Sequence, residues 1–180
     1  MELFTNRLLL FPITVDLAQI LMKNSLAFYY KFQLPWNKNW PHDGLKALLP
    51  IYVEKLEEEE GELGFGPWVM IDREGEHVVG DIGFKGRPDD EGVIEIGYHV
   101  VASERGVGYA TEAVEGLCQW AFEQPGVKGI EAQCDKANIA SQKVLINNGF
   151  FHTGRHREIF LFKKEKTLHE ATTDQFEEGL

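Results

Sequence analysis

Residues 100–122 read VVASERGVGYATEAVEGLCQWAF and contain the features that decide the fold. The end of an apolar strand runs into a turn with two glycines, and this turn leads directly into an amphipathic helix. The helix is expected to begin at or near Gly108. Its apolar positions recur at helical spacing and predict the buried face: Ala110, Ala113, Val114, Leu117 and Ala121.

The start of this helix is a candidate anion site. The first amides of a helix have no intrahelical partner and carry the positive end of the helix dipole. Gly106 and Gly108 have no side chain that would block a pyrophosphate, and Arg105 adds a positive charge. Two glycines before a helix are equally typical of an ordinary turn. A dinucleotide-binding turn fits less well, because the segment lacks the third glycine of that pattern.

The segments on both sides of this motif predict one mixed α/β sheet. Residues rich in Val, Ile, Phe and Tyr, separated by turn-forming strings, predict three antiparallel strands at Pro67–Ile71, His77–Phe84 and Gly92–Val101. The order then alternates, which favours a single, largely antiparallel sheet of about seven strands flanked by helices. The later elements are expected to be a helix at 108–122, a strand at 129–134, a helix at 138–148 and strands near 151–153 and 158–163.

The N-terminal part is expected to be a strand at Arg7–Phe11 followed by helices. Thr14 is a candidate cap for the first helix. Residues 33–42 have two prolines and two tryptophans without a clear period, which indicates an ordered connection whose aromatic side chains could line a pocket. A second helical pattern begins at Asp43 and ends in an acidic run before Gly61. Because Pro50 lies inside this pattern, we expect two shorter helices.

Composition limits the kind of protein. A length of 180 residues fits one globular domain, expected at 1–166, with a frayed acidic tail at 167–180. The net charge of −11 argues against a nucleic-acid partner. No apolar run approaches the length of a membrane helix and no secretory leader is visible, so a cytoplasmic location is expected. The two cysteines, Cys118 and Cys134, are predicted to be buried, with no metal site.

Several motifs resemble the GNAT superfamily of acetyltransferases. Residues 105–110, RGVGYA, fit its Arg/Gln-x-x-Gly-x-Gly/Ala acetyl-coenzyme A signature. TNRLLLFPI at 5–13 and EIGYHV at 95–100 resemble the branch of ribosomal-protein alanine and serine N-acetyltransferases. KANIASQKVLINNGF at 136–150 is similar to the NxxSxxxxEKxGF helix of that branch, although Phe11, Ile146 and Asn147 depart from the branch pattern. The resemblance implies a GNAT fold and acetyl-coenzyme A as donor, and it is compatible with a homodimer.

The resemblance also implies a set of coenzyme contacts. A backbone amide near Val100 or Val101 would polarise the thioester carbonyl. Asn138 would bind the pantetheine arm, and Ser141 would lie near the sulfur as a proton donor. From spacing alone, Asn138 could instead cap its helix and leave Ser141 solvated. The full set is Val100, Val101, Arg105, Gly106, Val107, Gly108, Tyr109, Ala110, Asn138 and Ser141.

The candidate general base is Glu95, which lies in the otherwise apolar string GVIEIGYHV. Burial of a carboxylate in an apolar setting would raise its pKa toward the working range of a general base, and the resemblance assigns a strand glutamate to this role. Glu95 could instead pair with a neighbouring polar group or face solvent. His99 shares its strand face. The base is therefore Glu95, His99 or solvent.

The leading hypothesis is direct acetyl transfer from acetyl-coenzyme A to a primary amine in a ternary complex, without a covalent enzyme intermediate. The acceptor would be a protein N-terminus or a small amine. The alternative is a non-catalytic acyl-coenzyme A sensor on the same fold, which needs the turn at 105–110 but does not need Glu95.

Overall fold

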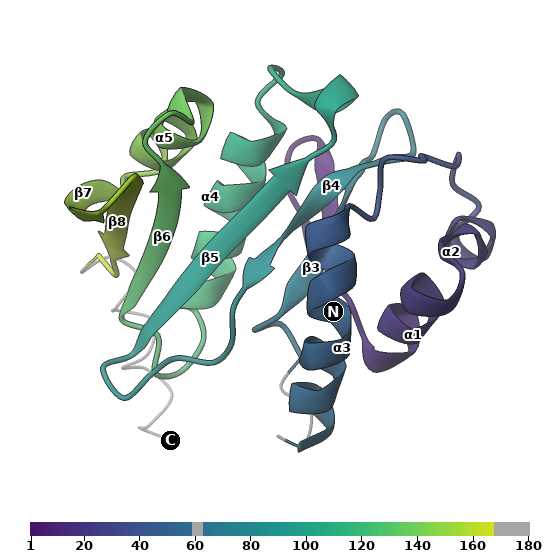
Figure 1. Ribbon diagram of the computed structural model, residues 1–180, viewed down its shortest axis with the longest axis horizontal. Helices are drawn as coiled ribbons and strands as arrows, with labels where there is room; N and C mark the ends of the chain where they lie inside the picture. Colours follow the sequence, from purple (N-terminus) through teal and green to yellow (C-terminus); the bar gives the residue numbers. More distant parts are fainter. Residues whose placement is uncertain (59–62, 168–180) are drawn as a thin grey trace, which may run out of the picture.

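A computed structural model describes residues 1–58 and 63–167 of the chain. It contains one mixed sheet with the strand order β1-β2-β3-β4-β5-β6-β8-β7 (Figure 1). The strands are β1 (Leu3–Phe4), β2 (Leu8–Pro12), β3 (Pro67–Asp72), β4 (His77–Phe84), β5 (Val93–Val100), β6 (Gly129–Asp135), β7 (Phe151–His156) and β8 (Ile159–Glu165). The helices are α1 (Val15–Lys23), α2 (Ser25–Phe32), α3 (Asp43–Glu58), α4 (Tyr109–Phe122) and α5 (Ile139–Asn147), with a 3-10 turn at Ala102–Glu104.

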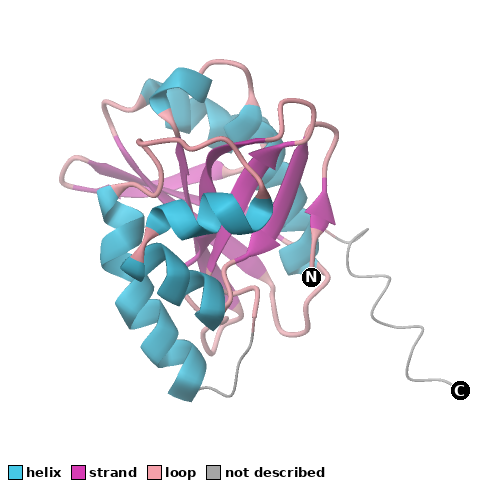
Figure 2. Cartoon of the chain, turned by 90° about the vertical axis from the view of Figure 1, so that its right-hand side faces the viewer, coloured by secondary structure: helices cyan, strands magenta, loops and turns pink. Residues whose placement is uncertain are grey.

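Helices cover both faces of the sheet. Figure 1 shows α3 in front of the strands and α4 behind them, and the turned view of Figure 2 shows helices on both sides of the sheet. Each face has its own core. The face under α4 includes Trp68, Ile82, Ile96 and Ile130, whereas the face under α1, α2 and α3 includes Phe11, Val69, Val78 and Val101.

The predicted mixed, largely antiparallel sheet is confirmed. Strands β2 to β5 pair antiparallel in chain order, so the expected meander of three strands is present with one more strand before it. Among the strands that the structure describes, only β5 and β6 pair in parallel, across the connection through α4. The short β1, which has two residues, brings the sheet to eight strands where about seven were expected.

The expectation that Pro50 divides the second helical segment is wrong. The structure has a single helix, α3, with Pro50 inside it. Leu45 and Leu49 before the proline and Tyr52 and Leu56 after it are buried in the same core. Burial of one continuous apolar face therefore outweighs the hydrogen bond that a proline removes from a helix.

Other expectations have mixed outcomes. Thr14 caps α1 by accepting a hydrogen bond from the Leu17 amide, and both cysteines are buried, as predicted. In the 33–42 connection, Trp40 belongs to the core, whereas Trp36 is exposed. The end of the acidic run at 59–61 and the tail from 168 on lie outside the described residues. Of the helices within residues 1–58 and 63–167, none has the length and apolar character needed to cross a membrane.

Candidate active site

The site begins where two parallel strands separate. β5 pairs with β6 only from Val93 to Ile96, opposite Gly129 to Ala132, although both strands continue beyond these residues. Helices α4 and α5 both start after the carboxyl ends of these two strands (Figure 1). Backbone groups alternate in direction along a strand. Because the amide of Val101 donates to Val79 on β4, the amides of Tyr98 and Val100 face the gap between β5 and β6.

The glycine turn lies at the same edge of the sheet. Gly106 and Gly108 have φ values of 82° and 92°, which L-residues with a side chain rarely adopt. Gly108 is the N-cap residue of α4 and supplies no side-chain hydrogen bond, so the first amides of the helix are left for an anion. Nothing lies within 4 Å of where a Cβ on Gly106 would be, which leaves this side of the turn open.

The turn is braced from the N-terminal strand, a feature that the sequence analysis missed. Arg7 donates from Nη1 to the carbonyl of Val107 at 2.9 Å, and its guanidinium carbon lies 4.8 Å from the centre of the Tyr109 ring. Its Nε donates to Glu112 at 2.8 Å, and Thr5 donates to the same carboxylate at 2.6 Å. These contacts join the connection between β1 and β2, the glycine turn and the first turn of α4 into one unit.

The two backbone amides proposed for carbonyl polarisation differ in the structure. The Val101 amide is bonded to Val79 at 2.9 Å, whereas the Val100 amide faces the gap. Arg105 donates from Nε to the Val100 carbonyl at 2.9 Å, so its guanidinium folds back over the end of β5. Of these two amides, the Val100 amide is therefore the one directed toward the gap.

Asn138 and Ser141 lie across the gap at the start of α5. The Asn138 side chain accepts a hydrogen bond from the Ser141 amide at 3.1 Å, so it caps the helix, as its spacing allowed. Its amide nitrogen remains as a donor. The Ser141 hydroxyl lies 2.7 Å from the Tyr98 hydroxyl, which connects α5 to β5 across the gap. Burial raises the pKa of Tyr98 to about 12, so this hydroxyl stays protonated at neutral pH.

Glu95 lies on the opposite face of β5, in an ion pair with Lys85, which directly follows β4. The next residue on that face is Gly97, which is exposed, and nothing lies within 4 Å of where its Cβ would be. The third is His99. Glu95 and His99 therefore flank an open position in the strand, at the point where β5 loses its partner β6.

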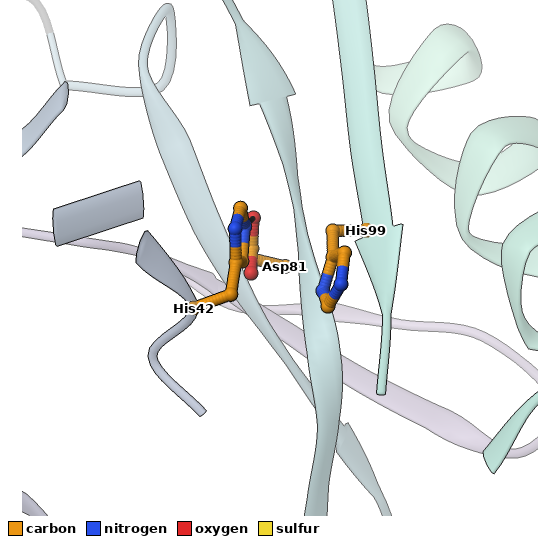
Figure 3. Close-up of side chains that lie close together, drawn as sticks. All are labelled: His42, Asp81 and His99. Carbon is orange, nitrogen blue, oxygen red and sulfur yellow. Dashed lines mark hydrogen bonds and ion pairs between the residues drawn. The ribbon is translucent and has the colours of Figure 1, made fainter. Parts of the chain in front are cut away.

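His99 belongs to a cluster that spacing along the chain could not reveal. His42 precedes α3, Asp81 lies on β4, and His99 lies directly opposite Asp81 in the β4–β5 register. Figure 3 shows the three side chains together, with the His42 and His99 rings stacked at a centroid distance of 4.0 Å. One ligand atom from each side chain lies within 4.8 Å of the other two. Trp40 donates from Nε1 to Asp81 at 2.9 Å.

This cluster opens on a cavity of about 200 Å³ between α3 and the strands. Leu45 and Leu48 of α3 line one side, and Gly97 of β5 lines the other. Because Gly97 also borders the gap between β5 and β6, the cavity and this gap meet at Gly97. The site therefore has two approaches, one on each face of β5.

Comparison with known proteins identifies the class. The acetyltransferase (GNAT) domain family matches residues 7–151, and the chain belongs to this family. It is an N-acetyltransferase by that membership, as the resemblance predicted. The uncharacterized N-acetyltransferase YjdG of Bacillus subtilis (strain 168) is 34% identical over 146 residues, which cover 81% of this chain and 87% of that protein.

Solved structures share the fold. A ribosomal-protein-S5-alanine acetyltransferase from Vibrio fischeri superposes with a TM-score of 0.64 at 20% identity, covering 92% of this chain and 96% of the other. RimL, an alpha-N-protein acetyltransferase solved in complex with coenzyme A, superposes with a TM-score of 0.66 at 14% identity, covering 92% of this chain and 98% of the other. The GNAT fold expected from the motifs is confirmed.

Proposed function

We propose that this chain transfers an acetyl group from acetyl-coenzyme A to a primary amine by direct attack in a ternary complex. The observation that carries the proposal is the open gap between β5 and β6, with the uncapped start of α4 at its mouth. The coenzyme pyrophosphate would bind the amides of residues 105–110, with Arg105 beside it. Gly106 and Gly108 would let the backbone approach the phosphates. Val107, Tyr109 and Ala110 complete this binding segment.

The pantetheine arm would follow the gap, where Asn138 offers its side-chain amide. The Val100 amide would donate to the thioester carbonyl and stabilise the negative charge that develops there. Ser141 would lie near the sulfur, and its bond to Tyr98 supports a role in returning a proton to the leaving thiolate. Burial raises the pKa of Tyr98 to about 12, so its hydroxyl is protonated at neutral pH when the thiolate leaves.

The amine would approach from the other face of β5, over Gly97. A primary amine is largely protonated at neutral pH and must lose a proton before it attacks the carbonyl. Glu95 and His99 flank this position, so either side chain, or water between them, is placed to accept that proton. The cavity of about 200 Å³ fits the end of a chain better than a large rigid substrate.

The acceptor is a protein N-terminus or a small amine. The net charge of −11 favours a cationic acceptor over a nucleic acid, and several structural neighbours act on ribosomal proteins. The second candidate, a non-catalytic acyl-coenzyme A sensor, would use the turn and the gap alone. The side chains gathered at Gly97 on the acceptor face favour the enzyme.

The experiment is calorimetric titration with acetyl-coenzyme A, followed by thiol release with a panel of amines. The panel contains peptides beginning with Ala or Ser, spermidine and an aminoglycoside. Binding with thiol release is the expected result. Binding without release from any acceptor would favour the sensor, and absence of binding would contradict both.

A further inference from the structure

We propose that His99 is the group that removes the proton from the acceptor amine, and that His42 and Asp81 are positioning residues that hold it ready. This inference rests on the proposed function, because it assigns the proton acceptor of that reaction. It is argued from the hydrogen bonds of the cluster, from the open position at Gly97 and from the partner that Glu95 already has.

The hydrogen bonds of His42 fix its tautomer. The Gly44 amide donates to His42 Nδ1 at 3.2 Å, so Nδ1 must carry the lone pair. Nε2 lies 3.3 Å from Asp81 Oδ1 and is therefore the nitrogen that holds the hydrogen and donates it. Both ring nitrogens therefore have hydrogen-bond partners, and His42 acts by orienting Asp81 and stacking on His99.

His99 is the available imidazole of the pair. Within the described part of the chain, its Nδ1 is a buried side-chain nitrogen without a hydrogen-bond partner, so Nε2 is the ring nitrogen open to the cavity. Burial lowers the pKa of His99, and the positive charge of Arg105 lowers it further, while the Asp81 carboxylate acts in the opposite direction. His99 is therefore neutral at neutral pH, and Asp81 stabilises the imidazolium that forms when it takes a proton.

Glu95 is less available than His99 although both flank Gly97. Its carboxylate is already paired with Lys85, and it would have to give up that charge partner to accept a proton. His99 gives up no partner at Nε2. His99 lines the cavity beside Gly97, whereas the lining includes Lys85 but not Glu95, so access and partner both favour the histidine.

The arrangement suits a proton better than a metal ion. A metal must lie in the plane of each imidazole ring, along the lone pair of its nitrogen. The His42 and His99 rings are stacked with only 30° between their planes, so their lone pairs run side by side instead of converging. Both oxygens of Asp81 are also engaged, one by Trp40 and one by His42.

The proposed step balances as follows. The ammonium group of the acceptor gives one proton to His99 Nε2, and the resulting amine forms a bond to the thioester carbonyl carbon. The carbon–sulfur bond then breaks, and the thiolate takes a proton from the Tyr98–Ser141 pair or from water. The second proton of the attacking nitrogen leaves as the amide forms and replaces the proton that the thiolate took. His99 returns its proton to solvent through the cavity. The products are the acetylated amine, free coenzyme A and one proton.

The test compares His99→Gln with Glu95→Gln, and uses His156→Gln on the exposed part of β7 as a matched histidine control. Thiol release from acetyl-coenzyme A is followed from about pH 5 to about pH 9, with an Ala-initiated peptide and with spermidine as acceptors. We expect His99→Gln to lower kcat about 100-fold, the lower end of what a general base contributes. We expect Glu95→Gln to lower it less than about tenfold, with coenzyme affinity unchanged in both variants.

The pH profile separates a catalytic role from a structural one. In the wild type, log(kcat/KM) should rise with a slope of about one below the pKa of His99 and level off above it, because the acceptor enters as an ammonium ion and only His99 must be deprotonated. His99→Gln should show a slope of about one up to the pKa of the amine, because the amine must then lose its proton to solvent. The titratable and charged groups that act on His99 are His42, Asp81 and Arg105, with Lys85 in the lining of the same cavity, and Glu95→Gln should keep the break.

Two results would overturn the proposal. One is a pH profile that loses its change of slope in Glu95→Gln and keeps it in His99→Gln. The other is a histidine NMR titration in which His99 is protonated at neutral pH or His42 carries its hydrogen on Nδ1. Absence of thiol release by the wild type would instead refute the proposed function, and with it this inference. Restoration of His99→Ala activity by added imidazole would support it directly.

Discussion

The brace behind the glycine turn leads to a prediction on Glu112. Its carboxylate accepts hydrogen bonds from the Thr5 hydroxyl at 2.6 Å, the Arg7 amide at 2.6 Å and Arg7 Nε at 2.8 Å. Glu112→Gln keeps the size of the side chain but turns one acceptor oxygen into a donor group. That group would face a hydrogen-bond donor of Arg7, so at least one charge-assisted bond is lost.

The magnitude follows from the burial of the pair. A hydrogen bond to a charged group contributes about 1.5–3 kcal/mol. The Glu112 side chain is 15% exposed and that of Arg7 is 39% exposed, so solvent screening puts the loss near the lower end. We expect the free energy of unfolding of Glu112→Gln to be about 1.5 kcal/mol below that of the wild type at about pH 7.

The loss should depend on pH in a defined direction. Burial raises the pKa of Glu112, but the hydrogen bonds from Thr5 and Arg7 outweigh it, and the net pKa lies below the ordinary 4.5. The stabilisation is therefore fully present above 4.5 and is lost as pH falls through the folded-state pKa. Urea unfolding at about pH 7 and about pH 3 measures it, with exposed Glu115→Gln on the same helix as control. Equal stability at neutral pH, or a difference that persists in acid, would refute the reasoning.

Three further predictions concern the coenzyme side. Gly108 has a φ of 92°, and a Cβ at this position would lie 3.3 Å from Arg7 Nη2. Gly108→Trp should therefore lower the affinity for acetyl-coenzyme A at least about tenfold, as measured by calorimetry. Unchanged affinity would contradict the placement of the pyrophosphate. Asn138→Ala should lower the free energy of unfolding by about 1 kcal/mol through loss of the cap, whereas Asn138→Asp should restore stability without restoring coenzyme affinity. Tyr98→Phe, which removes the hydroxyl bonded to Ser141, should lower kcat at least about tenfold with donor affinity unchanged; an unchanged kcat would exclude Tyr98 from proton return.

The helix of the coenzyme turn was predictable because its signals are local. The glycines at 106 and 108 are needed where φ is positive, and the apolar spacing from Ala113 to Ala121 matches the buried face of α4, although Ala110, also expected there, is only half-buried. Strand patterns in 67–101 are equally local, since side chains alternate between two cores. The failure at Pro50 has the opposite origin, because the core on both sides of that residue decides whether the helix continues.

The sequence by itself determined the order of the elements from β3 onward, the mixed sheet, the turn and the family, because each depends on neighbouring residues or on a short motif. It placed Glu95 and His99 on one strand face but could not choose between them as the base. Only the tertiary structure brought Lys85 to Glu95 and His42 with Asp81 to His99, since these partners come from other strands and from a connection with no pattern of its own. The chemistry at Gly97 therefore depends on contacts between distant segments, which no local spacing encodes.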